Sequence, residues 1–158
     1  MTATAYVEFV RRAYGSLERP TYHAILKLLE RDPYRSLRSE FPPSWSVEDV
    51  TDENDDVGSV WRITWGGGGT LLRLSMIGPY ATAFRLHSAG YATGECVFPP
   101  ATEGEGAAGR EEERRLADIV RGAGFALLSR AELDRTVPLR LANADEPVTL
   151  YEALFSYA

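Results

Sequence analysis

The feature that most limits how this chain can fold is a period-two alternation of apolar and polar side chains in its middle third. The alternation runs through three successive stretches, which are separated by a run of glycines and then by Gly78-Pro79. Such alternation is typical of strands with one buried face, and the short breaks fit hairpin turns. The pattern therefore predicts an antiparallel meander. Its strands are expected at 57–65, 72–76 and 80–87, with a shorter strand at 46–51 and an edge strand at 91–98.

Helical periodicity flanks this region on both sides. Apolar residues recur at three- and four-residue steps over 4–17 and again over 20–30, which predicts an N-terminal helical hairpin. After the strands, a charged segment has a narrow apolar strip, and two capping boxes mark the starts of short helices. These C-terminal helices are expected at 110–121, 130–135 and 150–157, the last two begun by the boxes Ser129–Glu132 and Thr149–Glu152.

The order helices, strands, helices predicts an α+β fold. We expect a single antiparallel meander sheet of four to five strands, with the N-terminal helical hairpin and the C-terminal helices packed on one face. Residues 33–45 contain three prolines and no clean period, so they are expected to cross irregularly and to place Phe41 and Trp45 in the core. The glycine-rich segment 101–109 is expected to be a loop within one domain that spans 1–158.

Composition excludes several classes of protein. The chain has 17 basic and 23 acidic residues and a formal charge of −6, whereas nucleic-acid binding usually needs a concentrated excess of bases. Cys96 is the only cysteine, so neither an intrachain disulfide nor a multi-cysteine metal site can form. Because no stretch approaches the roughly 18 apolar residues of a membrane helix, we expect a cytoplasmic protein that binds neither nucleic acid nor membrane. The oligomeric state stays open.

The motifs that suggest catalysis or metal binding are incomplete. Gly66–Gly69 lacks the following Lys-Ser/Thr of a phosphate loop, so it is interpreted as a hairpin turn. The D-x-N-x-D spacing from Asp52 imitates a calcium loop, but Val57 replaces the required glycine and Ile63 the required glutamate. No nucleophile–base signature surrounds Cys96 or the histidines. We therefore expect a protein that is not an enzyme and holds neither metal nor cofactor.

An acidic segment precedes the first long strand and has six carboxylates in nine residues, with no base. One interpretation is a solvated hairpin, because Asp and Asn suit turns. The other is a docking surface for a basic partner, since concentrated like charge steers association. The carboxylates of this candidate partner-binding surface are Glu48, Asp49, Asp52, Glu53, Asp55 and Asp56.

Strand register predicts a row of arginines. A four-residue loop at Gly66–Gly69 and a three-residue loop at 78–80 set the arginines of three strands directly opposite one another. Like charges in that position destabilise a sheet by up to about 1 kcal/mol per pair, so the row needs neutralising neighbours. These are carboxylates of the chain itself, with Glu48, Asp49 and Glu111–Glu113 as candidates, or else a bound anion or a partner's acidic patch. The predicted row is Arg62, Arg73 and Arg85, with His87 nearby.

The C-terminal third resembles a known group of proteins. It contains G-F-A-L-L-S-R-A-E-L from Gly124, V-P-L-R-L from Val137 and V-T-L-Y-E-A-L-F from Val148. This set resembles the endings of small bacterial proteins, some of which are similar to immunity proteins of polymorphic toxin systems. The resemblance implies a small, acidic, cytoplasmic protein that occludes a cognate toxin. It implies no particular site residues, because the residues that occlude the toxin vary.

Three functional hypotheses follow. The preferred one is a protein-binding module that neutralises a basic protein partner, such as an immunity protein that occludes a bacterial toxin. The alternative is a small-molecule or anion-binding module that uses the arginine row. The third is an accessory domain, whose signature would be an exposed aromatic patch. The residues expected in that patch are Trp45, Tyr151, Phe155 and Tyr157.

Overall fold

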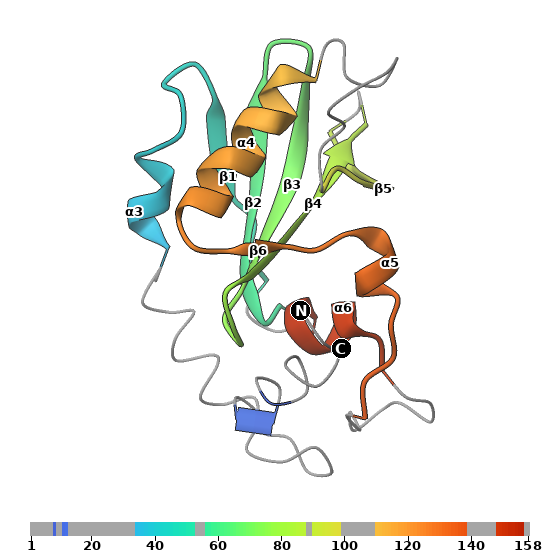
Figure 1. The fold of residues 1–158 in the computed structure, drawn as a ribbon. Helices are drawn as coiled ribbons and strands as arrows, with labels where there is room; N and C mark the ends of the chain where they lie inside the picture. Colours follow the sequence, from blue (N-terminus) through green and yellow to red (C-terminus); the bar gives the residue numbers. More distant parts are fainter. Residues whose placement is uncertain are drawn as a thin grey trace.

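The computed structural model describes residues 8, 11, 12, 34–52, 56–87, 90–98, 110–138 and 148–156. The fold is α+β and is built on a six-stranded sheet (Figure 1). Its strands are β1 (Ser46–Asp49), β2 (Gly58–Trp65), β3 (Gly68–Ser75), β4 (Tyr80–Leu86), β5 (Ala92–Cys96) and β6 (Ala126–Leu127). Its helices are α3 (Arg35–Arg38), α4 (Glu111–Gly122), α5 (Arg130–Leu133) and α6 (Leu150–Phe155).

The predicted meander is confirmed, because β1 to β5 pair with their chain neighbours in antiparallel order. The apolar segment Phe125–Leu128, which the sequence predicts to be a short strand or extended segment, contains β6, which pairs in parallel with the first residues of β4. The backbone N–H of Ala126 donates to the carbonyl of Pro79 at 2.7 Å, and that of Leu128 donates to Ala81 at 2.9 Å. The sheet is therefore mixed rather than purely antiparallel.

Apolar side chains cover the sheet on both faces, which corrects the prediction that all helices pack on one face. Helix α4 buries Leu116 and Val120 against one side, here called the α4 face. Helices α5 and α6 bury Leu133 and Leu154 against the other, here called the α6 face. The physical reason is that β4 is buried at every position from Tyr80 to Phe84, so both of its sides need apolar cover.

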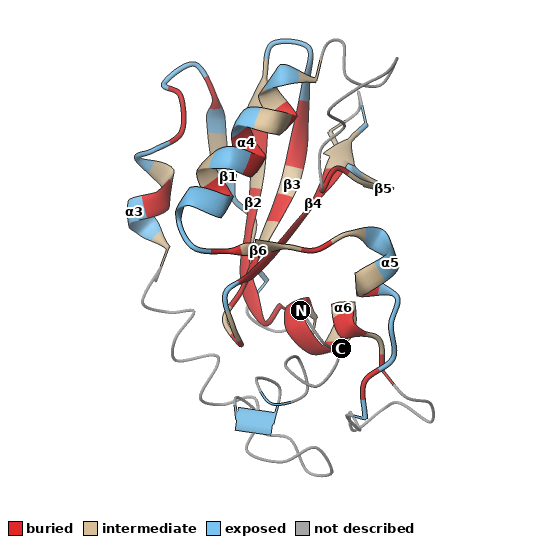
Figure 2. Ribbon diagram, viewed as in Figure 1, coloured by how far each residue is buried: buried red, intermediate tan, exposed pale blue. Residues whose placement is uncertain are grey.

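The two helical layers lie over different parts of the sheet. Helix α4 crosses β1, β2 and β3, whereas α5 and α6 lie toward the end of the sheet where β6 begins to pair (Figure 1). Figure 2 shows buried residues concentrated along β2, β3 and β4 and on α6. No described helix covers the half of the α6 face nearest the β2–β3 turn.

The irregular segment before β1 behaves as predicted. Phe41 and Trp45 are both buried, and the ring of Phe41 meets that of Trp61 edge-on at a centroid distance of 6.0 Å. The short helix α3, which was not predicted, adds buried Leu37 to the same core. Aromatic packing thus holds a segment that contains little regular hydrogen bonding.

Both predicted capping boxes are present. The N–H of Ser129 donates to Glu132 at 3.2 Å, and that of Thr149 donates to Glu152 at 2.7 Å. The helices they begin are shorter than predicted. A tertiary contact stabilises α6, because the Ser75 hydroxyl donates to the carbonyl of Leu154 at 2.7 Å.

Two predicted segments, the helical hairpin over 4–17 and 20–30 and the loop at 101–109, lie outside the described residues. Of the first helix only Glu8, Arg11 and Arg12 are described, and they are helical. None of the helices that the structure describes is long and apolar enough to span a membrane.

Candidate functional site

The β2–β3 turn sets the position of the first two arginines. The turn has two residues, Gly66 and Gly67, not the four predicted, and Arg62 lies opposite Leu71 rather than Arg73. Gly67 has a φ of 91°, a backbone conformation that glycine adopts readily. The observed pairing of β2 with β3 differs from the predicted one by two residues. Because this difference is even, every side chain stays on the predicted face of the sheet. Arg62 and Arg73 therefore share the α6 face as diagonal neighbours.

The β3–β4 register overturns the predicted row. Arg73 lies opposite Thr82, and Arg85 lies opposite Thr70. The difference from the predicted pairing is three residues, and an odd shift moves a side chain to the other face. Arg85 is therefore on the α4 face, away from Arg62 and Arg73. Because β4 is buried on both faces from Tyr80 to Phe84, the alternation of its side chains does not decide which face Arg85 occupies.

Each of the three arginines pairs with a carboxylate of the chain itself. Arg62 contacts Glu48 at 2.9 Å, and Arg73 contacts Asp56 at 3.0 Å. On the α4 face, Arg85 contacts Glu113 at 2.8 Å. Two of these carboxylates, Glu48 and Glu113, belong to the candidates within the chain. Internal neutralisation was one of the two alternatives that the sequence left open.

Arg85 is the centre of a charge cluster on the α4 face. Its Nε and Nη2 donate to the two carboxylate oxygens of Glu113 at 2.8 and 3.0 Å, and Glu95 also pairs with it. Arg110 lies 4.0 Å from Glu95. The hydrogen bond to Glu113 raises the pKa of Arg85, and the hydrogen bond from Arg85 lowers the pKa of Glu95. This cluster ties α4 and β5 to β4.

The acidic segment is divided between the two faces of the sheet. Asp49 lies on the α4 face and accepts a hydrogen bond from Arg38 at 2.9 Å. Asp56 is buried and accepts from Arg73 and from the backbone of Asp52. Asp52 is exposed. Glu53 and Asp55 lie outside the described residues. The described carboxylates of this segment thus form no single patch.

The expected aromatic patch is not exposed in the described part of the chain. Trp45 and Phe155 are buried, Tyr151 is half-buried against Phe84 and Phe155, and Tyr157 lies outside the described residues. The large apolar side chain that is exposed is Tyr91, at 59%. Its ring stacks on that of His87 at 4.8 Å.

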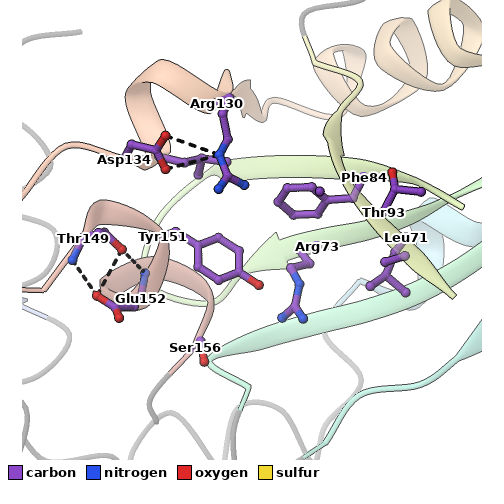
Figure 3. A pocket seen from close by; sticks show the side chains of 13 residues that line it. Leu71, Arg73, Phe84, Thr93, Arg130, Asp134, Thr149, Tyr151, Glu152 and Ser156 are labelled. Atoms are coloured by element: carbon purple, nitrogen blue, oxygen red, sulfur yellow. Dashed lines mark hydrogen bonds and ion pairs between the residues drawn. The ribbon is translucent and has the colours of Figure 1, made fainter.

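The α6 face contains two adjoining pockets of about 500 and 450 Å³, and α5 and α6 border the larger one. They share Leu71, Arg73, Ala92 and Ser156, and we call their combined surface the α6-face groove. Figure 3 shows the larger pocket, with Arg130 on α5 and Tyr151 on α6 reaching toward the sheet. The charged residues that line the groove are Arg62, Arg73, Arg130, Asp52, Asp56, Asp134 and Glu152. Its apolar residues include Leu71, Phe84, Leu86 and Leu133.

The groove brings together residues that were predicted from the sequence to belong to two separate sites. Asp52 and Asp56 of the acidic segment line it beside Arg62 and Arg73 of the predicted row. Tyr91 links His87 to the same surface. Asp49 and Arg85 are on the other face and do not contribute.

Sequence reasoning missed three charged residues of the groove, since it assigned Glu152 only to a capping box and did not single out Arg130 or Asp134. Arg130 and Asp134 form an i,i+4 pair at 3.3 Å on α5, and spacing alone cannot show which surface such a pair adjoins. Tyr151 was expected in an exposed patch, but it lies over Arg73, with the guanidinium carbon 5.5 Å from its ring centroid. Burial raises the pKa of Tyr151, so its hydroxyl stays protonated at neutral pH.

Another pocket, of about 500 Å³, lies between α3, the β3–β4 turn and the end of α4. Glu40 is the charged residue among its described lining side chains. Tyr34 at its wall donates to the carbonyl of Ser75, and burial raises the pKa of Tyr34 to about 12. This pocket offers few polar groups to orient a ligand. In the described part of the chain, no group of three or more His, Cys, Asp or Glu side chains could hold a metal ion.

Comparison with known proteins finds no family model, no curated protein and no solved structure that matches the chain.

Proposed function

We propose that this chain is a non-enzymatic binding protein that neutralises a basic protein partner, as immunity proteins do, and that it binds this partner through the α6-face groove. The observation that carries the proposal is the composition of the groove. Apolar side chains line it together with arginines, carboxylates and the exposed ring of Tyr91. Arginine and tyrosine beside apolar side chains are typical of protein interfaces.

The charge of the chain supports a basic partner. The formal charge is −6, and residues 39–109 contain ten acidic and three basic residues. Pairing within the chain leaves this net charge unchanged. Exposed ion pairs contribute only about 0.2–1 kcal/mol each, so carboxylates such as Glu48 can exchange an internal arginine for one of the partner. Complementary net charge then accelerates association.

The test is co-purification with the protein encoded by the adjacent reading frame, followed by measurement of association rates at low and high salt. Two variants reverse exposed carboxylates on the groove side, Glu48→Lys and Asp134→Lys, whose side chains are 63% and 60% exposed. We expect each to slow association by at least about tenfold at low salt, with a smaller effect at high salt.

The matched control is Asp118→Lys, which makes the same change in net charge on α4, where the side chain is 77% exposed. It should slow association much less than the groove variants do. Equal effects of all three variants would refute the groove as the binding surface. Absence of any retained partner at low salt would refute the proposed function.

A second candidate function, binding of a small anion, is supported by the larger pocket of the groove. This pocket places Arg73 and Arg130 around an apolar floor. The candidate no longer includes Arg85, which lies on the other face of the sheet.

A further inference from the structure

Two hydrogen-bond donors from distant parts of the chain meet in the larger pocket of the α6-face groove. Arg73 comes from β3 and Tyr151 from the first turn of α6. Figure 3 shows the Tyr151 ring pointing from α6 toward Arg73, in the space between Phe84 and Ser156. The packing of α6 on the sheet is what brings the two donors together, since the chain separates them widely.

Both side chains keep donors that the protein does not use. The hydrogen bond found for Arg73 joins Nη1 to Asp56 at 3.0 Å, while Nε is buried without an acceptor. Among the described residues, neither Arg73 Nη2 nor the Tyr151 hydroxyl has an acceptor. A guanidinium N–H and a phenol hydroxyl are suited to an oxyanion, because both donate hydrogen bonds.

The charges around the pocket favour an anion of the lowest charge. Asp56 already balances Arg73, and Asp134 balances Arg130 at 3.3 Å. Glu152 adds a further carboxylate to the lining. Any bound anion therefore brings charge that these arginines do not compensate, and uncompensated charge is costly in a partly buried site. A dianion brings twice as much of this charge as a carboxylate, so a carboxylate satisfies the donors at the lower cost.

The rest of the pocket is partly apolar. Leu71, Phe84 and Leu133 line it together with Thr93 and Thr149, and its volume is about 500 Å³. This space is much larger than a carboxylate alone requires, and small-molecule sites commonly have a volume of this size. The ligand should therefore have an apolar body attached to its charged group.

We propose that this pocket binds a monocarboxylate with an apolar body, whose carboxylate oxygens accept hydrogen bonds from Arg73 Nη2 and the Tyr151 hydroxyl. The proposal goes beyond the proposed function and does not depend on it, because it names a chemical group that the pocket itself recognises. The carboxylate can belong to a free small molecule or to the C-terminus of a polypeptide. The chemistry at Arg73 and Tyr151 is the same in both cases.

The experiment titrates the full chain, by calorimetry, with free acids and with peptides. Phenylacetate and hexanoate are compared with their uncharged amides and with inorganic phosphate. A short peptide that ends in phenylalanine is compared with its amidated form. We expect the acids or the free-carboxylate peptide to bind, and the amides and phosphate to bind at least about tenfold more weakly. Tighter binding of the acids identifies a small molecule, and tighter binding of the peptide identifies a chain terminus.

Two variants test the residues. Tyr151→Phe keeps the ring against Phe84 and Phe155 and removes only the hydroxyl, so it should fold and should weaken binding about tenfold. Arg73→Lys keeps the charge beside Asp56 but removes the Nη2 donor, and should also weaken binding. The matched control is Arg121→Lys, which makes the same exchange on α4, outside the groove, and should leave affinity unchanged.

Three results would overturn the proposal: no binding of any carboxylate, equal binding of acid and amide, or unchanged affinity in Tyr151→Phe. These results differ from a failure of the proposed function. If the groove variants lose the protein partner while no carboxylate binds the wild type, only the carboxylate proposal fails. If carboxylates bind as expected but no protein partner is retained, only the protein-binding function fails.

Discussion

At the scale of single residues, the burial of each ion pair determines how much it contributes to the free energy of unfolding. Glu113 is 9% exposed as a side chain and pairs through both oxygens with Arg85, whereas Glu95 contacts the same arginine but is 57% exposed. Removing one partner of a buried pair leaves the other charge without compensation, while an exposed pair loses little. Because Glu113 and Glu95 pair with the same arginine, substituting each in turn compares a buried carboxylate with an exposed one.

We expect Glu113→Gln to lower the free energy of unfolding by about 2 kcal/mol, because Arg85 then lacks its buried counterion. Glu95→Gln should lower it by less than about 0.5 kcal/mol. Urea denaturation at neutral pH measures both values. Equal losses in the two variants would mean that burial does not distinguish these carboxylates.

Some individual residues of the groove could be predicted from the sequence. Asp52, Asp56, Arg62 and Arg73 were all named from the sequence, and all four line the groove. The sequence showed the charges of all four residues and predicted the strands of Arg62 and Arg73. Tyr151 could not be assigned to this site, because its position depends on how α6 packs on the sheet.

At the scale of elements, the β2–β3 hairpin shows why a glycine run leaves the register open. Four consecutive glycines allow several turns, since each can adopt a positive φ. In the structure they play different roles. Gly67 has a φ of 91°, whereas a side chain at Gly69 would place its Cβ 2.6 Å from the carbonyl oxygen of Ile63. Gly66 has open space around it.

Substitution by alanine should separate these roles. We expect Gly69→Ala to be the most destabilising, because the strands must move apart to accept the Cβ. Gly67→Ala should cost about 1 kcal/mol through the positive φ. Gly66→Ala should lie within about 0.5 kcal/mol of the wild type. Thermal unfolding of the three variants measures this order, and a Gly66→Ala variant as unstable as Gly69→Ala would contradict it.

At the scale of the whole molecule, one sheet separates two cores. Leu116 of α4 and Leu154 of α6 are both fully buried, on opposite faces. The three tryptophans of the chain belong to the α4-face core or pack against it. Because β2, β3 and β4 contribute side chains to both faces, loss of either core removes support from the same strands.

We therefore expect Leu116→Ala and Leu154→Ala each to destabilise the protein by about 2–5 kcal/mol in one cooperative transition. Tryptophan fluorescence and far-ultraviolet circular dichroism should give the same midpoint for each variant. The decisive case is Leu154→Ala, whose cavity lies on the face without tryptophans. A fluorescence midpoint that stays at the wild-type value in this variant would show that the two cores unfold separately.

The sequence by itself determined the order of the meander strands and the approximate positions of α4, α5 and α6, since local signals specify them. Alternation predicted the meander, the boxes at Ser129 and Thr149 predicted the starts of α5 and α6, and Phe41 and Trp45 were identified as core residues. Each of these signals involves residues close together in the chain, where side-chain pattern and backbone hydrogen bonding act directly.

Only the tertiary structure decided which residues share a surface. An odd shift in the β3–β4 register placed Arg85 on the α4 face, and the packing of α6 placed Tyr151 over Arg73. The first outcome concerns β4, whose residues from Tyr80 to Phe84 are buried on both faces, so that alternation does not fix its orientation. The second depends on the long-range packing of α6 on the sheet. The α6-face groove is the surface that this packing leaves open.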